Sequence, residues 1–335
     1  MSKSKSKSQS KLKFTTGEEF RHYGVCDASA AITVGDESIF LVADDEDNIL
    51  RIYEGKKSGK AVAEFDVNHY FTNNPDKDEI DIEATSHIGE NIYWITSHGL
   101  SKKGKFKPER RNFFATKLNQ TENGYNLEQV GHSYTKLVDD LINSEKLKKY
   151  NFEQASKTAT KQKGGLNIEG LSSTPNQKEL LIGFRSPIID GKALIITLLN
   201  PESLVTQENG TAEFGDPIEL DLGGLGIRFL EYWPGQNKYV ISAGAYDGTD
   251  GFYLYLWSGN ACDKPEKMKD LKLPKGFTPE AIIIYPHLQN ELQILSDDGS
   301  VKRDGKTECK DLDANCEDKF FRSMWIQKKV DACDD

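Results

Sequence analysis

The sequence has few cysteines and no motif that places two of them close together. The five cysteines form an odd set with no Cys-x-x-Cys spacing: Cys26, Cys262, Cys309, Cys316 and Cys333. This pattern predicts reduced thiols, as in a cytosolic protein, rather than a disulfide framework or a zinc site. A chain of 335 residues needs neither in order to fold, because it buries roughly 75% of its unfolded surface.

Long apolar runs are also missing. No run approaches the roughly 20 residues of a membrane-spanning helix, and the first residues, MSKSKSKSQSKLK, lack the apolar core of an export signal. We therefore expect a cytoplasmic protein without a membrane partner. The sequence indicates no oligomeric state.

Several familiar catalytic motifs do not occur. The absence of Gly-x-Ser-x-Gly, His-Glu-x-x-His and P-loop patterns excludes the usual serine hydrolases, zincins and P-loop NTPases. The run Gly223-Gly224-Leu225-Gly226 is not a dinucleotide fingerprint, because no helical pattern follows it. We expect no organic cofactor.

The charge is unevenly divided. The net charge is -10, yet residues 1–13 hold five lysines and no acid, so the remainder carries 38 basic and 53 acidic residues. An acidic body argues against general nucleic-acid binding, which depends on neutralising phosphates. The Lys/Ser-rich segment has low complexity and no apolar face, which predicts a disordered, solvated tail; an arm that binds nucleic acid or a membrane is the alternative.

Most of the remaining chain has the pattern of short β-strands. Stretches such as SIFLVAD, NIYWITS, ALIITLL and KYVISAG are rich in β-branched and aromatic residues, and Gly, Asn, Asp and Pro separate them. Helical periodicity occurs once, where Leu137, Val138, Leu141, Ile142 and Leu147 share a face. This predicts a surface helix and a mobile loop over about residues 136–163, inserted into an otherwise all-β chain.

One pattern recurs five times: a polar or charged residue at the start of a short strand, followed by a turn and a second strand. The central residues of the five copies are Asp27, Glu83, Glu169, Arg228 and Glu280. Their spacings are 56, 86, 59 and 52 residues, and the long spacing contains the helical insertion. A period of about 55 residues with four strands is typical of a propeller blade.

The repeats predict a single β-propeller domain over residues 14–330, with about five four-stranded blades. A strand around Leu12–Thr15 is expected to pair with the last strand, KFFRSMWIQ, and so to close the ring and remove its free edges. A degenerate sixth blade within residues 130–166 is one alternative. A pair of β-sandwiches is another, although it does not explain the regular spacing.

Several strings in the chain resemble a known family. GVCDASAAITV, FLVADDEDNILRIYE, DIEATSHIGENIYWITSHG, PERRNFFATKL, NIEGLSS, LLIGFRSP and LSDDGS occur in this order over about residues 20–326. They resemble the bacterial family called domain of unknown function 3616, which implies a propeller-like fold and no particular activity.

A looser similarity rests on Ile168-Glu169-Gly170-Leu171. This segment is similar to esterase-like phytase and gluconolactonase-type propellers. In the latter, the resemblance implies that a Glu before a Gly at an inner strand start binds a divalent metal. Only Glu169 is followed by Gly here, since Ala follows both Glu83 and Glu280.

Antiparallel geometry predicts where the charged residues gather. The start of each innermost strand lies beside the end of the second strand, so both sets open on one face of the channel. The second strands end at Asp45, His98, Arg185, Gly244 and Asp297. We therefore expect these ends beside the five central residues of the repeats.

Carboxylates that converge in this way repel one another unless cations lie among them. Arg185 and Arg228 are one source of positive charge, and a Ca²⁺ ion, which accepts six to eight oxygen ligands, is another. The alternative is a solvated polar channel. The candidate metal ligands are Asp27, Glu83, Glu169, Glu280, Asp45 and Asp297.

The run from Asp44 to Asn48 carries five oxygen-bearing side chains. It lacks the glycine and terminal glutamate of an EF-hand loop. We interpret Asp47 and Asn48 as turn residues and keep Asp44 and Asp45 as candidates, because they end the second strand.

Two further features suggest binding or chemistry at this face. His98 suits a general base or a phosphate contact, although a structural role is the alternative. The loop from Lys102 to Arg111 has six basic residues and one acid, so it would attract an anionic ligand, although a solvated hairpin explains it equally well.

Two functions fit this pattern. The first is a metal-dependent hydrolase of phosphoesters or other anionic esters, in which His98 moves a proton and Arg185 and Arg228 stabilise charge in the transition state. The second is a non-catalytic module that binds an anionic small molecule or a protein partner. Propellers support both, so the fold does not decide between them.

Overall fold

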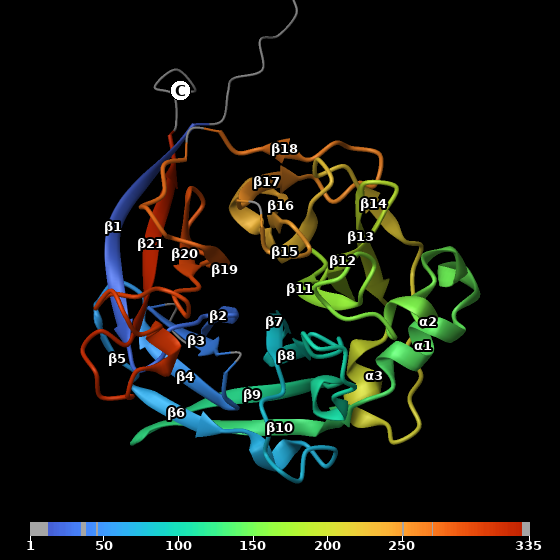
Figure 1. Ribbon diagram of the computed structural model, residues 1–335, viewed down its shortest axis with the longest axis horizontal. Coiled ribbons are helices and arrows are strands. Elements are labelled where there is room, and N and C mark those ends of the chain that lie inside the picture. Colours follow the sequence, from blue (N-terminus) through green and yellow to red (C-terminus); the bar gives the residue numbers. More distant parts are fainter. Residues whose placement is uncertain (1–12, 35–37, 45, 250, 270, 330–335) are drawn as a thin grey trace, which may run out of the picture.

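The computed structural model shows five β-sheets arranged around a central channel (Figure 1). The structure describes residues 13–34, 38–44, 46–249, 251–269 and 271–329. The tail predicted for residues 1–13 and the candidate ligand Asp45 therefore lie, apart from Lys13, outside the described residues.

Each sheet is an antiparallel blade whose first strand lines the channel. The first blade contains β2 (Ala30–Val34), β3 (Ile39–Ala43), β4 (Ile49–Glu54) and β6 (Ala63–Asp66). The second contains β7 (Ile82–Ile88), β8 (Asn91–Thr96), β9 (Phe113–Thr121) and β10 (Gly124–Tyr134). The third contains β11 (Asn167–Ser173), β12 (Leu180–Ile189), β13 (Lys192–Leu198) and β14 (Ile218–Leu220).

The last two blades complete the ring. The fourth contains β15 (Gly226–Trp233), β16 (Lys238–Gly244), β17 (Tyr253–Trp257) and β18 (Glu266–Lys267). The fifth contains β19 (Pro279–Ile283), β20 (Glu291–Ser296), β21 (Phe320–Lys328) and β1 (Phe14–Tyr23), to which β5 (Gly59–Lys60) adds in parallel. The prediction of five four-stranded blades is confirmed, and the described part of residues 130–166 forms no sixth blade.

The ring closes by pairing the two ends of the propeller. Strand β1 pairs with β21 from Phe14 opposite Lys328 to Tyr23 opposite Phe320. The closing strand is longer than the predicted Leu12–Thr15, but it occupies the predicted place. Closure in this way leaves the fifth blade with strands from both ends of the chain and removes two edges that could pair with other molecules.

Apolar side chains fill the spaces between neighbouring blades. The described residues form five buried clusters, one at each blade–blade interface, which is why alternate residues of most strands are apolar. Between the fifth and first blades, for example, Phe321 and Trp325 pack in the same cluster as Phe40 and Tyr53. The core is therefore a ring of interfaces around the channel.

The predicted insertion lies outside the ring beside the third blade (Figure 1). It consists of α1 (Leu137–Asn143), the 3-10 helix η3 (Glu145–Tyr150) and α2 (Phe152–Ala155). Its apolar residues join the cluster between the second and third blades: Leu137, Val138, Leu141, Leu147, Tyr150, Phe152 and Ala155. Helices thus occur within residues 136–163, and their apolar stripe packs into the core between the second and third blades.

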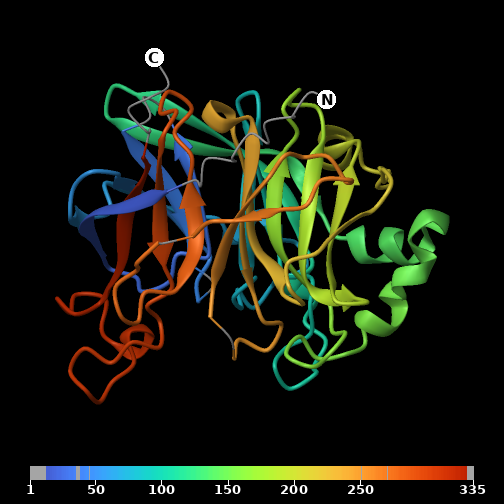
Figure 2. The same cartoon turned by 90° about the horizontal axis from the view of Figure 1, so that it is seen from above.

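The other helical segments are short connections. They are α3 (Pro201–Thr206) and the 3-10 helices η1 (Asn68–Tyr70), η2 (Pro108–Arg110), η4 (Pro234–Gln236) and η5 (Cys309–Asp311). No helix of the described chain is long and apolar enough to cross a membrane. Long connections that follow the second strands project from one end of the channel (Figure 2).

Candidate functional site

Three glutamates from three blades converge at one end of the channel. Glu83 lies on β7, Glu169 on β11 and Glu280 on β19, and a carboxylate oxygen of each lies within 4.8 Å of the others. Glu169 and Glu280 are 2% and 7% exposed, so their charges are largely removed from water. We call these three residues the glutamate triad.

A β-bulge explains why these side chains turn toward the channel. The pairing between the first and second strands shifts register at Glu83, Glu169, Arg228 and Glu280, each of which is the extra residue. A bulge bends the strand and redirects the extra side chain out of the regular alternation. The repeated pattern in the sequence thus marks four equivalent bulges.

Two arginines neutralise much of the negative charge of the triad. Arg228 places its Nε 2.9 Å from Glu169 Oε2 and also forms an ion pair with Glu280. The Nη1 atom of Arg185 lies 2.7 Å from Glu169 Oε1, and its Nε donates to the carbonyl of Ala245 at 3.1 Å. Two guanidinium groups among three carboxylates leave a net negative charge in the cluster.

The pKa values reflect both burial and this pairing. Burial acts to lower the pKa of Arg228, but the carboxylates of Glu169 and Glu280 outweigh it and raise the pKa above its ordinary value. Burial raises the pKa of Glu280 to about 7, although Arg228 opposes the shift. The Oε2 atom of Glu280 is buried and accepts no hydrogen bond from the described residues.

Tight packing fixes the strands that carry these side chains. A Cβ on Gly170 would lie 3.1 Å from the Cα of Gly183 and 3.0 Å from Ile227 Cγ2. This close packing where the third and fourth blades meet favours glycine after Glu169, which is a structural reason for the Glu169-Gly170 pair.

The remaining predicted ligands occupy different places. Asp27 and Asp297 flank Gly299, since a Cβ on that glycine would lie 3.6 Å from Asp27 Oδ2 and 3.2 Å from Asp297 Oδ1. Asp297 is close enough to Glu280 to raise its pKa. These two aspartates thus lie together beside the glutamate triad.

Asp44 belongs to a separate buried cluster near the end of β3. Its Oδ1 accepts a hydrogen bond of 2.7 Å from the backbone N of Glu46. Asp47 accepts from the backbone N of Ile49 and binds Arg51, as expected of a turn residue. Burial first, and the carboxylate of Asp47 second, raise the pKa of Asp44 to about 7.

Replacing Asp44 by Asn is expected to stabilise the protein above about pH 7. The folded protein keeps the Asp44 proton to about pH 7, whereas the unfolded chain loses it near pH 4. Stability therefore falls as the pH rises through this window. Asp44→Asn removes this loss and should raise the free energy of unfolding by roughly 2 kcal/mol at pH 8. This is about half of the value that the full pKa shift would give, because burying the Asn amide also costs free energy. At pH 4 the substitution should change the free energy of unfolding very little. Urea unfolding at the two pH values measures the difference, and an equal effect at both would contradict the assignment.

His98 is buried and hydrogen-bonds to the backbone. Its Nδ1 lies 2.8 Å from the carbonyl of Thr96, and its own backbone N donates to the carbonyl of Arg110 at 2.9 Å. Burial lowers the pKa of the imidazole to about 4, so the ring is neutral near pH 7. No described interaction joins it to the glutamate triad, and this geometry favours the structural alternative considered for His98.

The basic loop is partly neutralised by its own neighbours. Lys107 binds Asp78 and Glu109 at 2.9 and 2.7 Å, and Arg111 lies over the ring of Phe106. Lys102, Lys103 and Lys105 remain exposed. Only part of the predicted positive charge is therefore available to a ligand.

Sequence reasoning missed a second group of charges beside the triad. Arg110 forms ion pairs with Glu79 and Asp81, and the latter distance is 3.0 Å. Burial raises the pKa of Asp81, as does the negative charge of Glu169. The alternation of acids at positions 79, 81 and 83 was the signal, because every second residue of an extended segment lies on the same side.

Two exposed lysines from different segments, Lys102 and Lys161, also lie near this end of the channel. Lys161 follows α2 within the insertion. Burial lowers its pKa, and so do the nearby positive charges of Lys102, Arg185 and Arg228. Lys102 and Lys161 therefore add exposed positive charge near the buried carboxylates of Glu169 and Glu280.

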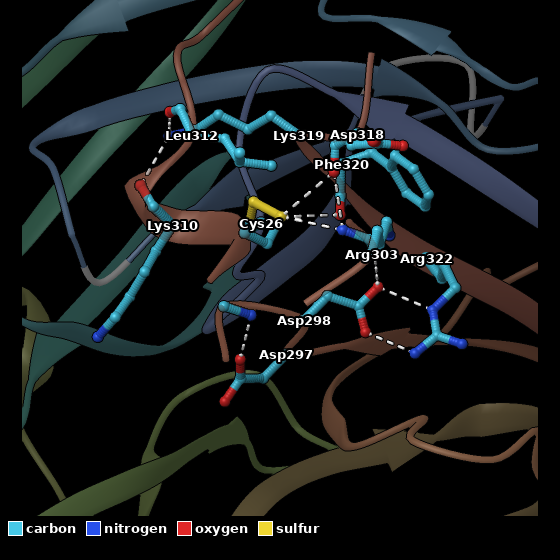
Figure 3. The surroundings of a disulfide bond; sticks show 12 residues. Cys26, Asp297, Asp298, Arg303, Lys310, Leu312, Asp318, Lys319, Phe320 and Arg322 are labelled. Carbon is cyan, nitrogen blue, oxygen red and sulfur yellow. Dashed lines mark hydrogen bonds and ion pairs between the residues drawn. A yellow bond between two sulfur atoms is a disulfide. The ribbon is translucent and has the colours of Figure 1, made fainter. Parts of the chain in front are cut away.

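A disulfide bond supports the same end of the channel (Figure 3). Cys26, next to Asp27, is joined to Cys309 in the connection between β20 and β21. This corrects the prediction that all cysteines are reduced, which relied on motif spacing and could not detect partners 283 residues apart. The cytoplasmic location was inferred in part from reduced cysteines, and the disulfide removes that support. The cytoplasmic location stays a prediction.

The connection that carries Cys309 is anchored further by Asp298, which is fully buried. Its carboxylate binds Arg303 and Arg322, both at 2.7 Å (Figure 3). The backbone N of Asp298 donates to the carbonyl of Cys26 at 2.9 Å. These contacts fix Asp297, the neighbour of Glu280, relative to the first blade.

With this geometry established, the family can be stated. A model of the family described as "Protein of unknown function (DUF3616)" matches residues 27–128 and 111–291. The chain belongs to this family. The DUF3616 match spans most of the propeller and includes all three residues of the glutamate triad, and it confirms the resemblance seen in the sequence. No curated protein sequence matches the chain.

Solved structures similar to this DUF3616 protein share little sequence with it. Glutaminyl cyclase from Myxococcus xanthus has 10% identity and a TM-score of 0.46, covering 96% of this chain and 100% of its own. A putative oxidoreductase (glucose dehydrogenase) from Thermus thermophilus has 12% identity and a TM-score of 0.45, covering 94% and 99%.

Proposed function

We propose that the glutamate triad binds a divalent cation, with Ca²⁺ as the first candidate, and that the occupied site hydrolyses a phosphoester or another anionic ester. The observation that carries this proposal is the approach of three carboxylate oxygens to within 4.8 Å of one another from three separate blades. Carboxylate oxygens are the ligands that Ca²⁺ prefers, and its coordination tolerates irregular geometry.

The state of Glu280 gives independent support. Its Oε2 atom is buried and has no hydrogen-bond donor among the described residues. A buried oxygen without a donor costs free energy, and a cation among the triad would remove this cost. Asp27 and Asp297 lie near enough to add further oxygens, directly or through water.

The surrounding positive charge suits an anionic substrate. Lys102 and Lys161 are exposed at the entrance and would attract it. Arg185 and Arg228 would then stabilise negative charge that develops on the ester. A bound divalent cation would supply a water of lowered pKa and polarise the ester.

A second candidate is a module that binds an anionic small molecule or a protein partner without turnover. The position of His98 favours it, because the imidazole makes its hydrogen bond to Thr96 rather than to a group of the triad. Arg185 and Arg228 already form ion pairs with Glu169, so the charge of each guanidinium group is partly balanced without a substrate.

A comparison of Glu83→Gln with Glu122→Gln tests the proposal. Both remove one negative charge, but Glu83 belongs to the triad and Glu122 is exposed in the turn between β9 and β10. Protein treated with EDTA is assayed with phosphoesters and lactones, with and without added Ca²⁺. We expect Ca²⁺-dependent turnover that Glu83→Gln lowers by about a hundredfold or more, at a cost of roughly 3 kcal/mol in transition-state binding.

The other outcomes separate the two candidates. Ca²⁺ binding without turnover of any ester in the panel would favour the binding module. Turnover that survives EDTA and Glu83→Gln would contradict the proposed site. Equal loss of activity in Glu122→Gln would indicate a general effect of charge.

A further inference from the structure

A cavity occupies the opposite end of the channel from the glutamate triad. It has a volume of about 370 Å³ and is lined where the innermost strands of all five blades end. Its walls are largely apolar, with contributions from Ile32, Pro175, Pro234, Ile282 and Ile284. Small-molecule sites typically combine this size and apolar lining with a few polar groups.

The polar groups of this cavity include one acid, Glu231, which is 9% exposed. Its carboxylate accepts hydrogen bonds from the backbone N of Tyr232 at 2.9 Å and from Ser172 Oγ at 3.3 Å. The first of these donors is on β15 and the second on β11, so the carboxyl group is held in place across a blade boundary.

Glu231 has no cationic partner in the described part of the chain. None of the described residues that line the cavity is Lys or Arg, and Glu231 forms no ion pair within the described chain. Burial raises the pKa of the carboxyl to about 8, against the opposing effect of its hydrogen bonds. Unlike the triad, this buried acid faces a cavity without any arginine to balance it.

Two other polar side chains of the cavity have unused hydrogen-bonding capacity. The imidazole of His87 makes no hydrogen bond to a described residue, and burial lowers its pKa, so the ring is neutral near pH 7. The hydroxyl of Thr33 is buried and also has no described partner. A neutral imidazole nitrogen and a hydroxyl oxygen can both accept hydrogen bonds.

We propose that this cavity binds a small organic amine, whose apolar body packs against the isoleucines and prolines and whose ammonium group pairs with Glu231. An ammonium has three donors and no acceptor, which suits a site with a carboxylate and further acceptors at His87 and Thr33. An ammonium beside Glu231 also favours the ionised form of this acid, whereas the negative charge of a carboxylate or phosphate ligand would oppose it. The proposal does not depend on a cation at the triad.

A charge series of ligands on one skeleton tests this assignment. 2-Phenylethylamine, 2-phenylethanol and 3-phenylpropionate, together with benzylamine and cyclohexylamine, are titrated into the full-length protein by calorimetry at pH 7. We expect at least one amine to bind, and 2-phenylethanol to bind about tenfold or more weakly than its amine, which corresponds to about 1.4 kcal/mol. The carboxylate should not bind.

Three variants identify the site. Glu231→Gln keeps the shape of the side chain and should weaken amine binding by about tenfold or more, whereas Glu122→Gln, with the same change of net charge, should leave it unaltered. Glu83→Gln should also leave it unaltered, because the triad is at the other end. Equal binding of amine and alcohol, undiminished binding by Glu231→Gln, or no binding by any amine at millimolar concentration would each overturn the proposal.

Discussion

Replacing Gly226 by Ala is expected to destabilise the protein by at least about 4 kcal/mol. Gly226 begins β15, and a Cβ there would lie 2.6 Å from the carbonyl carbon of Arg185 and 2.7 Å from its Cα, and closer still to its oxygen. Real Cβ atoms do not approach so closely, and the obstacle is backbone rather than a flexible side chain. The strands β12 and β15 would have to separate.

The same separation would affect the site, because Arg228 on β15 binds Glu169 across this boundary, and Arg185 on β12 binds the same carboxylate. We expect Gly226→Ala to lower the midpoint of urea unfolding and to abolish Ca²⁺ binding together. Gly59→Ala is the matched control, since a Cβ at Gly59 meets no atom within 4 Å. It should change stability by less than about 0.5 kcal/mol. Similar effects of the two substitutions would mean that β12 and β15 do not approach as described.

Removing the disulfide is expected to cost about 2–5 kcal/mol of unfolding free energy. The bond joins Cys26 to Cys309 over 283 residues, so it restricts a long loop in the unfolded chain. The double substitution Cys26→Ser and Cys309→Ser removes it. Because Cys309 is fully buried, part of the cost would come from placing a hydroxyl group in its site.

The paired substitution Cys262→Ser and Cys316→Ser is the control, since neither cysteine belongs to a disulfide. Urea unfolding should give a large loss for the first pair and little change for the second. Alkylation of unfolded protein followed by peptide mapping checks the bond itself. Cys26 and Cys309 should be modified only after reduction, and modification without a reductant would contradict the pairing.

The blade repeat and the position of the triad follow from the sequence for one physical reason. Glu83, Glu169 and Glu280 occupy equivalent bulges, and a repeated local structure places equivalent residues at equivalent distances from the axis. In a propeller, the place of a residue within its repeat predicts where it lies within its blade. A period of about 55 residues therefore predicts which residues meet at the channel.

Other features depend on contacts between distant segments, which the spacing of the repeats does not predict. The disulfide joins Cys26 to the β20–β21 connection, and its partner could only be recognised once the ring had closed. The helical insertion looked peripheral because it interrupts the repeat, yet Leu137 and Phe152 are almost fully buried. His98 followed the repeat in sequence, but its ring makes a hydrogen bond to the backbone carbonyl of Thr96, which the repeat spacing does not reveal.

The main competing explanation is that Arg228 balances the negative charge of the triad, since an arginine can do so without any metal. Its effect on Ca²⁺ affinity separates the two accounts. If a cation lies among the glutamates, Arg228→Ala should leave the affinity similar or stronger, because the substitution removes a positive charge that repels the ion.

Calorimetric titration of Ca²⁺ into EDTA-treated protein tests the central claim most directly. A cation among the glutamates predicts saturable binding at one site, weakened about tenfold or more by Glu83→Gln and unchanged by Glu122→Gln. At a free Ca²⁺ concentration of 100 times the dissociation constant, the bound ion should also add about 2.7 kcal/mol to the unfolding free energy. If neither Ca²⁺ nor Mg²⁺ nor Mn²⁺ binds at millimolar concentration, the triad lines a polar channel in which Arg185 and Arg228 neutralise the carboxylates. That result would exclude the metal-dependent hydrolase.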